Sequence, residues 1–162
     1  MDNLQRSEIP GATATASVLY VEDDAVNAVL MEAIVGMRAC TTLRIALDGA
    51  QAIQMASQER FDLWLLDMHL PDMNGFELLA ALRQHATLPE VPAVAVSAAT
   101  SPQDLANARA HGFIGYWTKP LDLQRTLAEL DQLLAPVLAP HTAKTPTALP
   151  TDSAPPAPEG RR

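Results

Sequence analysis

The chain lacks several features that would direct it to other classes of protein, beginning with cysteine pairs and long apolar runs. Its single cysteine, Cys40, cannot form an intrachain disulfide, and its apolar neighbours indicate a small core residue rather than a nucleophile. No stretch approaches the about 20 apolar residues that span a membrane, and residues 1–8 are too polar for a signal peptide. We therefore expect a cytoplasmic protein without a membrane partner.

Positive charge is also scarce. The formal net charge is -8, from 11 Lys and Arg against 19 Asp and Glu. Phosphate-rich partners require clustered Lys and Arg, so this composition argues against binding to nucleic acid. With 162 residues, 48% of them hydrophobic, the chain is long enough for one well-buried core and too short for two domains of ordinary size.

The composition shifts near both ends of the chain. Residues 1–16 have few periodic apolar positions, and we expect them to form a flexible leader. Residues 136–162 hold seven of the 13 prolines among Ala, Thr and Ser, which predicts a disordered tail because such a segment buries too little apolar surface to offset its ordering entropy. Residues 17–135 remain as one folded domain of ordinary size.

Short apolar or β-branched runs alternate with segments of helical period in this domain. We expect strands over residues 18–21, 43–46, 61–66, 91–96 and 113–117, and helices over 49–58, 73–84 and 102–110. In the first helix one apolar face carries Val26, Val29, Leu30, Ala33, Ile34 and Met37, and in the last helix it carries Leu123, Leu127, Leu130 and Leu134. This alternation predicts an α/β fold, a doubly wound five-stranded parallel sheet with helices on both faces.

Reactive side chains follow four of the five expected strands. These are Glu22, Asp23 and Asp24 after the first strand, Asp67 after the third, Ser97 after the fourth and Lys119 after the fifth. Open α/β sheets place their ligand sites outside the carboxyl ends of the strands, so we expect these groups to meet. Ordinary alternatives stay open. Asp67 could cap the next turn, and Asp24 could cap the first helix. Ser97 could form a hydrogen bond with a loop amide, and Glu22 could be a solvated acid.

Lysine is scarce enough to be informative. The chain has only Lys119 and Lys144, so the expected domain contains one lysine, placed directly before Pro120. Near the carboxylates, Lys119 would provide a counter-charge for an anion. The sequence does not choose between a cis and a trans bond from Lys119 to Pro120.

This set of groups fits phosphoryl transfer. Clustered carboxylates without a His/Cys ligand set favour a hard cation, and Mg²⁺ typically takes one or two carboxylates together with phosphate oxygens and water. We predict that Asp67 is the nucleophile and a metal ligand, and that Glu22 and Asp23 hold the metal. Lys119 and Ser97 would bind the phosphoryl oxygens.

Five motifs, in their order and spacing, resemble the receiver domain of two-component response regulators. They are Leu19-Tyr20-Val21-Glu22-Asp23-Asp24, Leu66-Asp67-Met68-His69-Leu70-Pro71-Asp72-Met73-Asn74-Gly75, Val96-Ser97-Ala98, Gly115-Tyr116 and Thr118-Lys119-Pro120. The resemblance covers residues 17–135. It implies a flavodoxin-like sheet with strand order 2-1-3-4-5.

The resemblance also implies a role for each residue of the acidic motifs. Asp67 matches the phosphoacceptor. Asp23 would be the more direct Mg²⁺ ligand, Glu22 would act partly through water, and Asp24 would fall outside the pair. The backbone carbonyl of His69 would complete the metal site, and its side chain, unusual at this position, could alter hydrolysis or remain an exposed loop histidine.

The remaining motifs match the groups that respond to phosphorylation. Lys119 matches the lysine of the family pattern, Ser97 the switch hydroxyl, and Tyr116 the aromatic residue that swings inward. Without the family, Tyr116 could be a half-buried strand tyrosine. Phosphorylation would then shift a protein-binding face built from the fourth helix, the fifth strand and the fifth helix.

The function expected from these assignments is phosphorelay signal transduction. The receiver would accept a phosphoryl group on Asp67 from a sensor histidine kinase or a histidine phosphotransfer protein, and would act on a downstream protein target. It would be a phosphoprotein that catalyses only its own phosphorylation and dephosphorylation. Two alternatives are a Mg²⁺-dependent phosphohydrolase with an aspartyl phosphate intermediate and a phosphorylation-independent scaffold. Whether the receiver stands alone or belongs to a hybrid kinase is also open.

Overall fold

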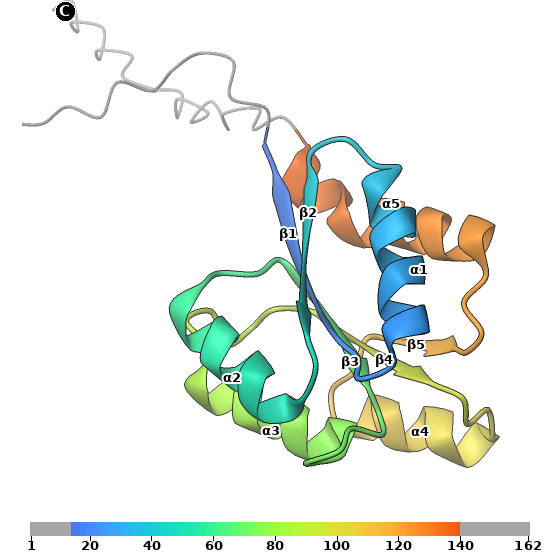
Figure 1. Ribbon diagram of the computed structural model, residues 1–162. Helices are drawn as coiled ribbons and strands as arrows, with labels where there is room; N and C mark the ends of the chain where they lie inside the picture. Colours follow the sequence, from blue (N-terminus) through green and yellow to red (C-terminus); the bar gives the residue numbers. More distant parts are fainter. Residues whose placement is uncertain (1–13, 140–162) are drawn as a thin grey trace, which may run out of the picture.

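The computed structural model describes residues 14–139, so the expectations for residues 1–13 and 140–162 lie outside the described residues. Strands and helices alternate along this part of the chain (Figure 1). The strands are β1 (Ala16–Val21), β2 (Thr41–Ala46), β3 (Leu63–Asp67), β4 (Ala93–Ser97) and β5 (Gly115–Thr118). The helices are α1 (Ala25–Gly36), α2 (Gly49–Gln58), α3 (Gly75–His85), α4 (Pro102–Ala110) and α5 (Leu123–Leu138).

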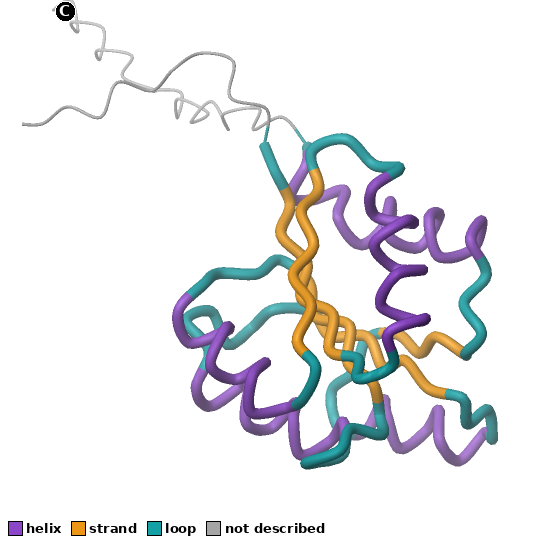
Figure 2. Tube along the Cα trace, viewed as in Figure 1, coloured by secondary structure: helices purple, strands orange, loops and turns teal. Residues whose placement is uncertain are grey.

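The strands gather into one sheet at the centre of the fold (Figure 2). They are parallel and lie in the order β2-β1-β3-β4-β5, which confirms the expected topology. Every residue of β3 and β4 is buried, as expected for parallel strands that are covered on both faces. The strand order reverses between β1 and β3, where chain crossovers leave in opposite directions. Open sheets bind ligands at such a point, beyond the carboxyl ends of the strands.

Helices cover both faces of the sheet, which confirms the doubly wound arrangement. Helices α1 and α5 pack on one face, and α2, α3 and α4 on the other (Figure 1). The alternating side chains of the strands divide the core accordingly: Tyr20 and Leu65 belong to the α1/α5 side, and Leu19 and Trp64 to the opposite side. Because all five strands are parallel, the loops that follow them lie at the same edge of the sheet.

Each helix begins with a side chain that accepts a hydrogen bond from its first turn. These caps are Asp24, Asp48, Asn74, Ser101 and Asp122. In α3 and α4 the cap is reciprocal, because Glu77 and Asp104 also bind the backbone of the cap residue. The short loops between strand and helix are thus fixed at both ends.

The apolar face predicted for α1 is wrong for most of its residues. Val26, Val29 and Met37 are 76%, 63% and 65% exposed, and the buried residues are Ala28, Met31, Ile34 and Val35. Ile34 alone belongs to both sets. Because α1 is apolar on nearly all sides, its periodicity does not distinguish the packed face from the exposed one.

The ends of the last elements also differ from the prediction. Strand β5 begins at Gly115 instead of residue 113, and Phe113 is buried in the loop before it, where its ring contacts Phe76. Helix α5 runs through Pro136 to Leu138, and β1 starts at Ala16, so both elements extend slightly beyond residues 17–135. Packing of Leu138 against the α1/α5 side explains the longer helix. Leu123, expected on its apolar stripe, is exposed.

Arg83 fixes the loop that enters β4. Its guanidinium donates hydrogen bonds to the carbonyls of Pro89 and Val91 and lies 5.0 Å from the ring centroid of Trp64. We expect Arg83→Ala to lower the free energy of unfolding in urea by about 1–3 kcal/mol, because both carbonyls lose a charged donor. Arg44→Ala, which removes an exposed ion pair with Glu59, should cost less than about 1 kcal/mol. Equal losses in the two variants would contradict this role for Arg83.

Candidate functional site

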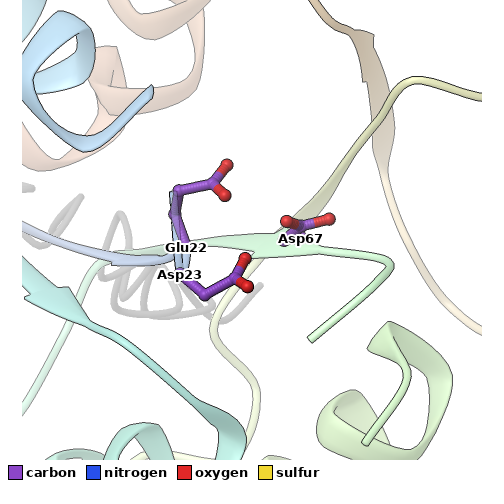
Figure 3. Close-up of side chains that lie close together, drawn as sticks. All are labelled: Glu22, Asp23 and Asp67. Carbon is purple, nitrogen blue, oxygen red and sulfur yellow. The ribbon is translucent and has the colours of Figure 1, made fainter. Parts of the chain in front are cut away.

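Three carboxylates from two neighbouring strands meet at the carboxyl edge of the sheet. Glu22 and Asp23 directly follow β1, and Asp67 is the last residue of β3. The strands pair with Val21 opposite Leu66, so the three residues come next to one another. One oxygen atom from each side chain lies within 4.8 Å of the other two, and the carboxylates reach toward a shared space (Figure 3).

Lys119 brings a single positive charge to this cluster. Its Nζ atom lies 2.6 Å from Oε2 of Glu22 and 2.8 Å from Oδ2 of Asp67, so one ammonium bridges two buried carboxylates. The lysine follows β5, and its backbone N–H donates to the carbonyl of Ser97 at 2.9 Å. The bond from Lys119 to Pro120 is cis. Burial alone would lower the pKa of Lys119, but the two carboxylates outweigh it and raise the pKa, which keeps the ammonium charged.

Asp67 is almost completely buried, with 4% of its surface exposed. Its Oδ1 atom accepts a hydrogen bond of 3.0 Å from the backbone N–H of His69, while Oδ2 faces Lys119. Burial raises the pKa of Asp67 and outweighs the lowering by Lys119 and the His69 N–H; the charge of Glu22 adds to the rise. The carboxylate is therefore held in one orientation in surroundings that make its negative charge costly.

Glu22 has a hydrogen-bond partner that the sequence interpretation missed. The buried Tyr20 hydroxyl donates to Oε2 of Glu22 at 2.9 Å, and the backbone N–H of Asp24 donates to Oε1 at 3.1 Å. Burial opposes ionisation of Glu22, yet its hydrogen bonds from Lys119, Asp24 and Tyr20 together hold its pKa below the usual value. Burial, and then the charge of Glu22, raise the pKa of Tyr20, so its hydroxyl remains a donor.

Asp23 and Asp24 differ in what they do. Oδ1 of Asp24 accepts hydrogen bonds from the N–H groups of Val26 and Asn27, at 2.8 and 3.1 Å, and so caps α1. This is the capping alternative left open for Asp24. Asp23 is exposed and belongs to the three-carboxylate cluster, so the cluster has one carboxylate open to solvent beside two buried ones.

Ser97 and Tyr116 both bind the backbone of Ala99, in the loop after β4. The Ser97 hydroxyl oxygen accepts from the Ala99 N–H at 3.1 Å, and the Tyr116 hydroxyl donates to the Ala99 carbonyl at 2.8 Å. Ser97 is buried and Tyr116 is half-buried. Both line a cleft that also includes the half-buried Phe76 and the exposed His69. In this conformation the Ser97 hydroxyl oxygen therefore accepts from a loop amide, which is the alternative that the sequence left open for Ser97.

The composition of the cluster suits a hard divalent cation. Three carboxylates and one ammonium leave two negative charges uncompensated, and all the donor atoms in the cluster are oxygens. Mg²⁺ prefers carboxylate, carbonyl and water oxygens over nitrogen or sulfur ligands. The residues therefore fit Mg²⁺, with the exposed Asp23 accessible to an ion entering from solvent.

Comparisons with known proteins identify the family. The model of the response regulator receiver domain matches residues 18–131, and the chain belongs to this family. It is 30% identical over 118 residues to the polar-differentiation response regulator DivK of Brucella anthropi, covering 73% of this chain and 95% of DivK. Receiver domains act in two-component signalling.

The chain is also similar to the receiver parts of sensor kinases. It is 36% identical over 127 residues to the sensor histidine kinase AruS of Pseudomonas aeruginosa, covering 75% of this chain but only 13% of AruS. The receiver domain of sensor histidine kinase PA1611 from Pseudomonas aeruginosa has the same fold, with a TM-score of 0.66, 27% identity, and coverage of 75% and 99% of the two chains. That structure has a magnesium ion coordinated in its active-site cleft.

No helix within residues 14–139 is both long enough and apolar enough to cross a membrane.

Proposed function

We propose that this receiver accepts a phosphoryl group on Asp67 from a phosphohistidine donor and thereby switches a protein-binding face. The observation that carries the proposal is the single ammonium of Lys119 between the buried carboxylates of Glu22 and Asp67, beside the exposed Asp23. When bound at Glu22, Asp23, Asp67 and the carbonyl of His69, Mg²⁺ would supply positive charge that offsets the transferred phosphoryl group.

In the proposed transfer, Asp67 acts as the nucleophile. A carboxylate oxygen of Asp67 forms a bond to phosphorus as the bond from phosphorus to the donor imidazole nitrogen breaks, and the imidazole keeps that electron pair. Lys119 and the Ser97 hydroxyl hold the phosphoryl oxygens. Burial and the His69 N–H keep the carboxylate of Asp67 oriented for this attack.

The proposed switch uses the two side chains that bind Ala99. A phosphoryl group on Asp67 attracts the Ser97 hydroxyl as a donor, which releases the Ala99 N–H that Ser97 holds here. Tyr116 already lines the adjacent cleft with its hydroxyl on the Ala99 carbonyl, and phosphorylation would favour this inward position of the ring. Because Tyr116 lies on β5, the position of its ring affects the surface formed with α4 and α5, where Leu105 and Ile114 are exposed. A downstream protein would bind this surface.

The exposed apolar side chains at the start of α1 favour a protein donor. Val26 lies two residues after the cap Asp24, and so flanks the acidic site, whereas Met37 ends the helix about 16 Å farther along its axis. We expect Val26→Glu to slow transfer from a phosphorylated histidine phosphotransfer protein about tenfold, because it places a charge in the contact surface.

Met37→Glu is the matched control, since Met37 is similarly exposed but distant from the site. Rates are measured by transfer of labelled phosphate, and both variants should react with acetyl phosphate like the parent chain. A Val26 variant that slows acetyl phosphate labelling equally would contradict docking on this part of α1.

The experiment that tests the proposed function is phosphotransfer to the purified chain from a phosphorylated histidine phosphotransfer protein or sensor kinase. We expect label to move to the chain in the presence of Mg²⁺ and to stop moving when EDTA is added. Steady turnover of a generic phosphomonoester would indicate a phosphohydrolase instead. Equal affinity for a protein partner with and without beryllofluoride would indicate a scaffold that does not depend on phosphorylation.

A further inference from the structure

The loop that follows Asp67 is fastened to a neighbouring helix by Asp72. Oδ1 of Asp72 accepts the backbone N–H of Gly49, and Oδ2 accepts the N–H of Ala50, both at 2.9 Å. Desolvation acts in the opposite direction, but these N–H groups hold the pKa of the exposed Asp72 below its usual value. A charged carboxylate from the loop between β3 and α3 thus binds the first turn of α2, on the favourable end of that helix dipole.

Helix α2 has its own cap without Asp72. Asp48 accepts the N–H of Gln51 at 2.7 Å through its side chain and the N–H of Ala52 at 3.1 Å through its backbone carbonyl. The four N–H groups that open α2 are therefore shared between two aspartates. Asp48 precedes the helix in the chain, whereas Asp72 reaches it from the loop of the phosphorylation site. Loss of Asp48 would therefore disturb only the cap of α2, whereas loss of Asp72 would also free the loop.

The loop between Asp67 and Asp72 is short and constrained. The N–H of Leu70 donates to the carbonyl of Met73, and the N–H of Gly75 donates to the carbonyl of Met68, both at 3.2 Å. A Cβ atom at Gly75 would lie 3.1 Å from the carbonyl oxygen of Asp67, so the chain packs closely behind the site. A displacement of one end of this loop is therefore transmitted to the other end.

The start of α2 is shaped to receive the loop. A Cβ atom at Gly49 would lie only 2.4 Å from the Sδ atom of Met73, so the glycine leaves the space that Met73 fills. The loop consequently contacts α2 through the Met73 side chain as well as through the carboxylate of Asp72. Together these contacts hold the loop in one place relative to the sheet.

We propose that Asp72 is a positioning residue for the metal site, and this inference rests on the proposed function. Asp72 does not belong to the three-carboxylate cluster; it acts through the loop that carries His69. By holding that loop on α2, Asp72 fixes where the His69 backbone lies relative to Asp67, whose Oδ1 accepts the His69 N–H. A freed loop would bind Mg²⁺ less tightly, because its carbonyl ligand must be ordered on binding.

The test compares Asp72→Ala with Asp48→Ala, which removes the other acceptor at the same helix end. Mg²⁺ affinity of the unphosphorylated full chain is measured by isothermal titration calorimetry, and helix stability by exchange of the α2 backbone amides. We expect Asp72→Ala to weaken Mg²⁺ binding about tenfold. Asp48→Ala should accelerate amide exchange at the start of α2 while leaving the Mg²⁺ affinity unchanged. Asp72→Asn, which keeps one acceptor oxygen, should retain part of the affinity.

Two results would overturn the inference: parental Mg²⁺ affinity in Asp72→Ala, or an equal loss of affinity in Asp48→Ala, which would reduce Asp72 to a helix cap. A parent chain that binds no Mg²⁺ at all would overturn the proposed function itself, and the inference with it. The parental titration therefore separates the two failures.

Discussion

Asp67→Asn should abolish labelling of the chain by acetyl phosphate in the presence of Mg²⁺. The amide has no anionic oxygen with which to attack phosphorus, and Asp67 is the carboxylate that Lys119 and the His69 N–H hold at the end of β3. The same substitution should raise the free energy of unfolding. Because burial raises the pKa of Asp67, its ionised form opposes folding at neutral pH, and the neutral amide removes that cost. Intact-mass spectrometry and urea unfolding measure the two effects.

Asp24→Asn is the matched control for this prediction. It removes a carboxylate next to the cluster, but Asn caps a helix about as well as Asp, so α1 should keep its start. We expect labelling close to that of the parent chain. If Asp67→Asn were labelled as fully as Asp24→Asn, the assignment of Asp67 as phosphoacceptor would be wrong.

Lys119→Met should reduce the rate of labelling about 100-fold, because the phosphoryl oxygens lose their ammonium partner. Without Mg²⁺ it should also lower the free energy of unfolding by about 3–5 kcal/mol, since Glu22 and Asp67 are buried and would face each other without a counter-charge. Added Mg²⁺ should restore part of this stability, since the ion binds the folded chain.

The reciprocal variant separates the two roles of Lys119. In the Lys119→Met background, Glu22→Gln removes one of the two negative charges that repel each other. It should therefore recover part of the lost stability without recovering labelling. The double-mutant cycle should therefore show a coupling of more than about 1 kcal/mol between the two positions. Additive effects on stability would contradict an ion pair that stabilises the fold.

The fold and the position of the site could be predicted from the sequence because both follow from strands that end in reactive groups. Each expected run contributed a strand to the sheet, and parallel strands bring their carboxyl ends to one edge. Glu22, Asp23, Asp67 and Lys119 therefore come together although as many as 97 positions separate them along the chain. The strand expected over residues 61–66 could be placed from its apolar residues alone. The strand observed there, β3 (Leu63–Asp67), is buried at every residue.

Other features depended on packing that one-dimensional patterns do not describe. Helix α1 is apolar on nearly every side, so its packed face could not be chosen from periodicity, and Val26 and Met37 were assigned to the wrong side. Asp72 binds α2 across 22 and 23 positions, a contact fixed only by how the loop lies in space.

Tyr20 did leave a signal in the sequence. It stands on β1 two residues before Glu22, which directly follows the strand, and positions i and i+2 of an extended chain share a face, so its hydroxyl could have been expected at the site.

The most direct test of the account is to locate the phosphoryl group on the parent chain. The protein is incubated with acetyl phosphate and Mg²⁺, digested under conditions that preserve acyl phosphates, and sequenced by tandem mass spectrometry. The account predicts one phosphoryl group per chain, on Asp67, absent when EDTA is present. Phosphate on any other residue, or none while a known receiver is labelled in parallel, would contradict it.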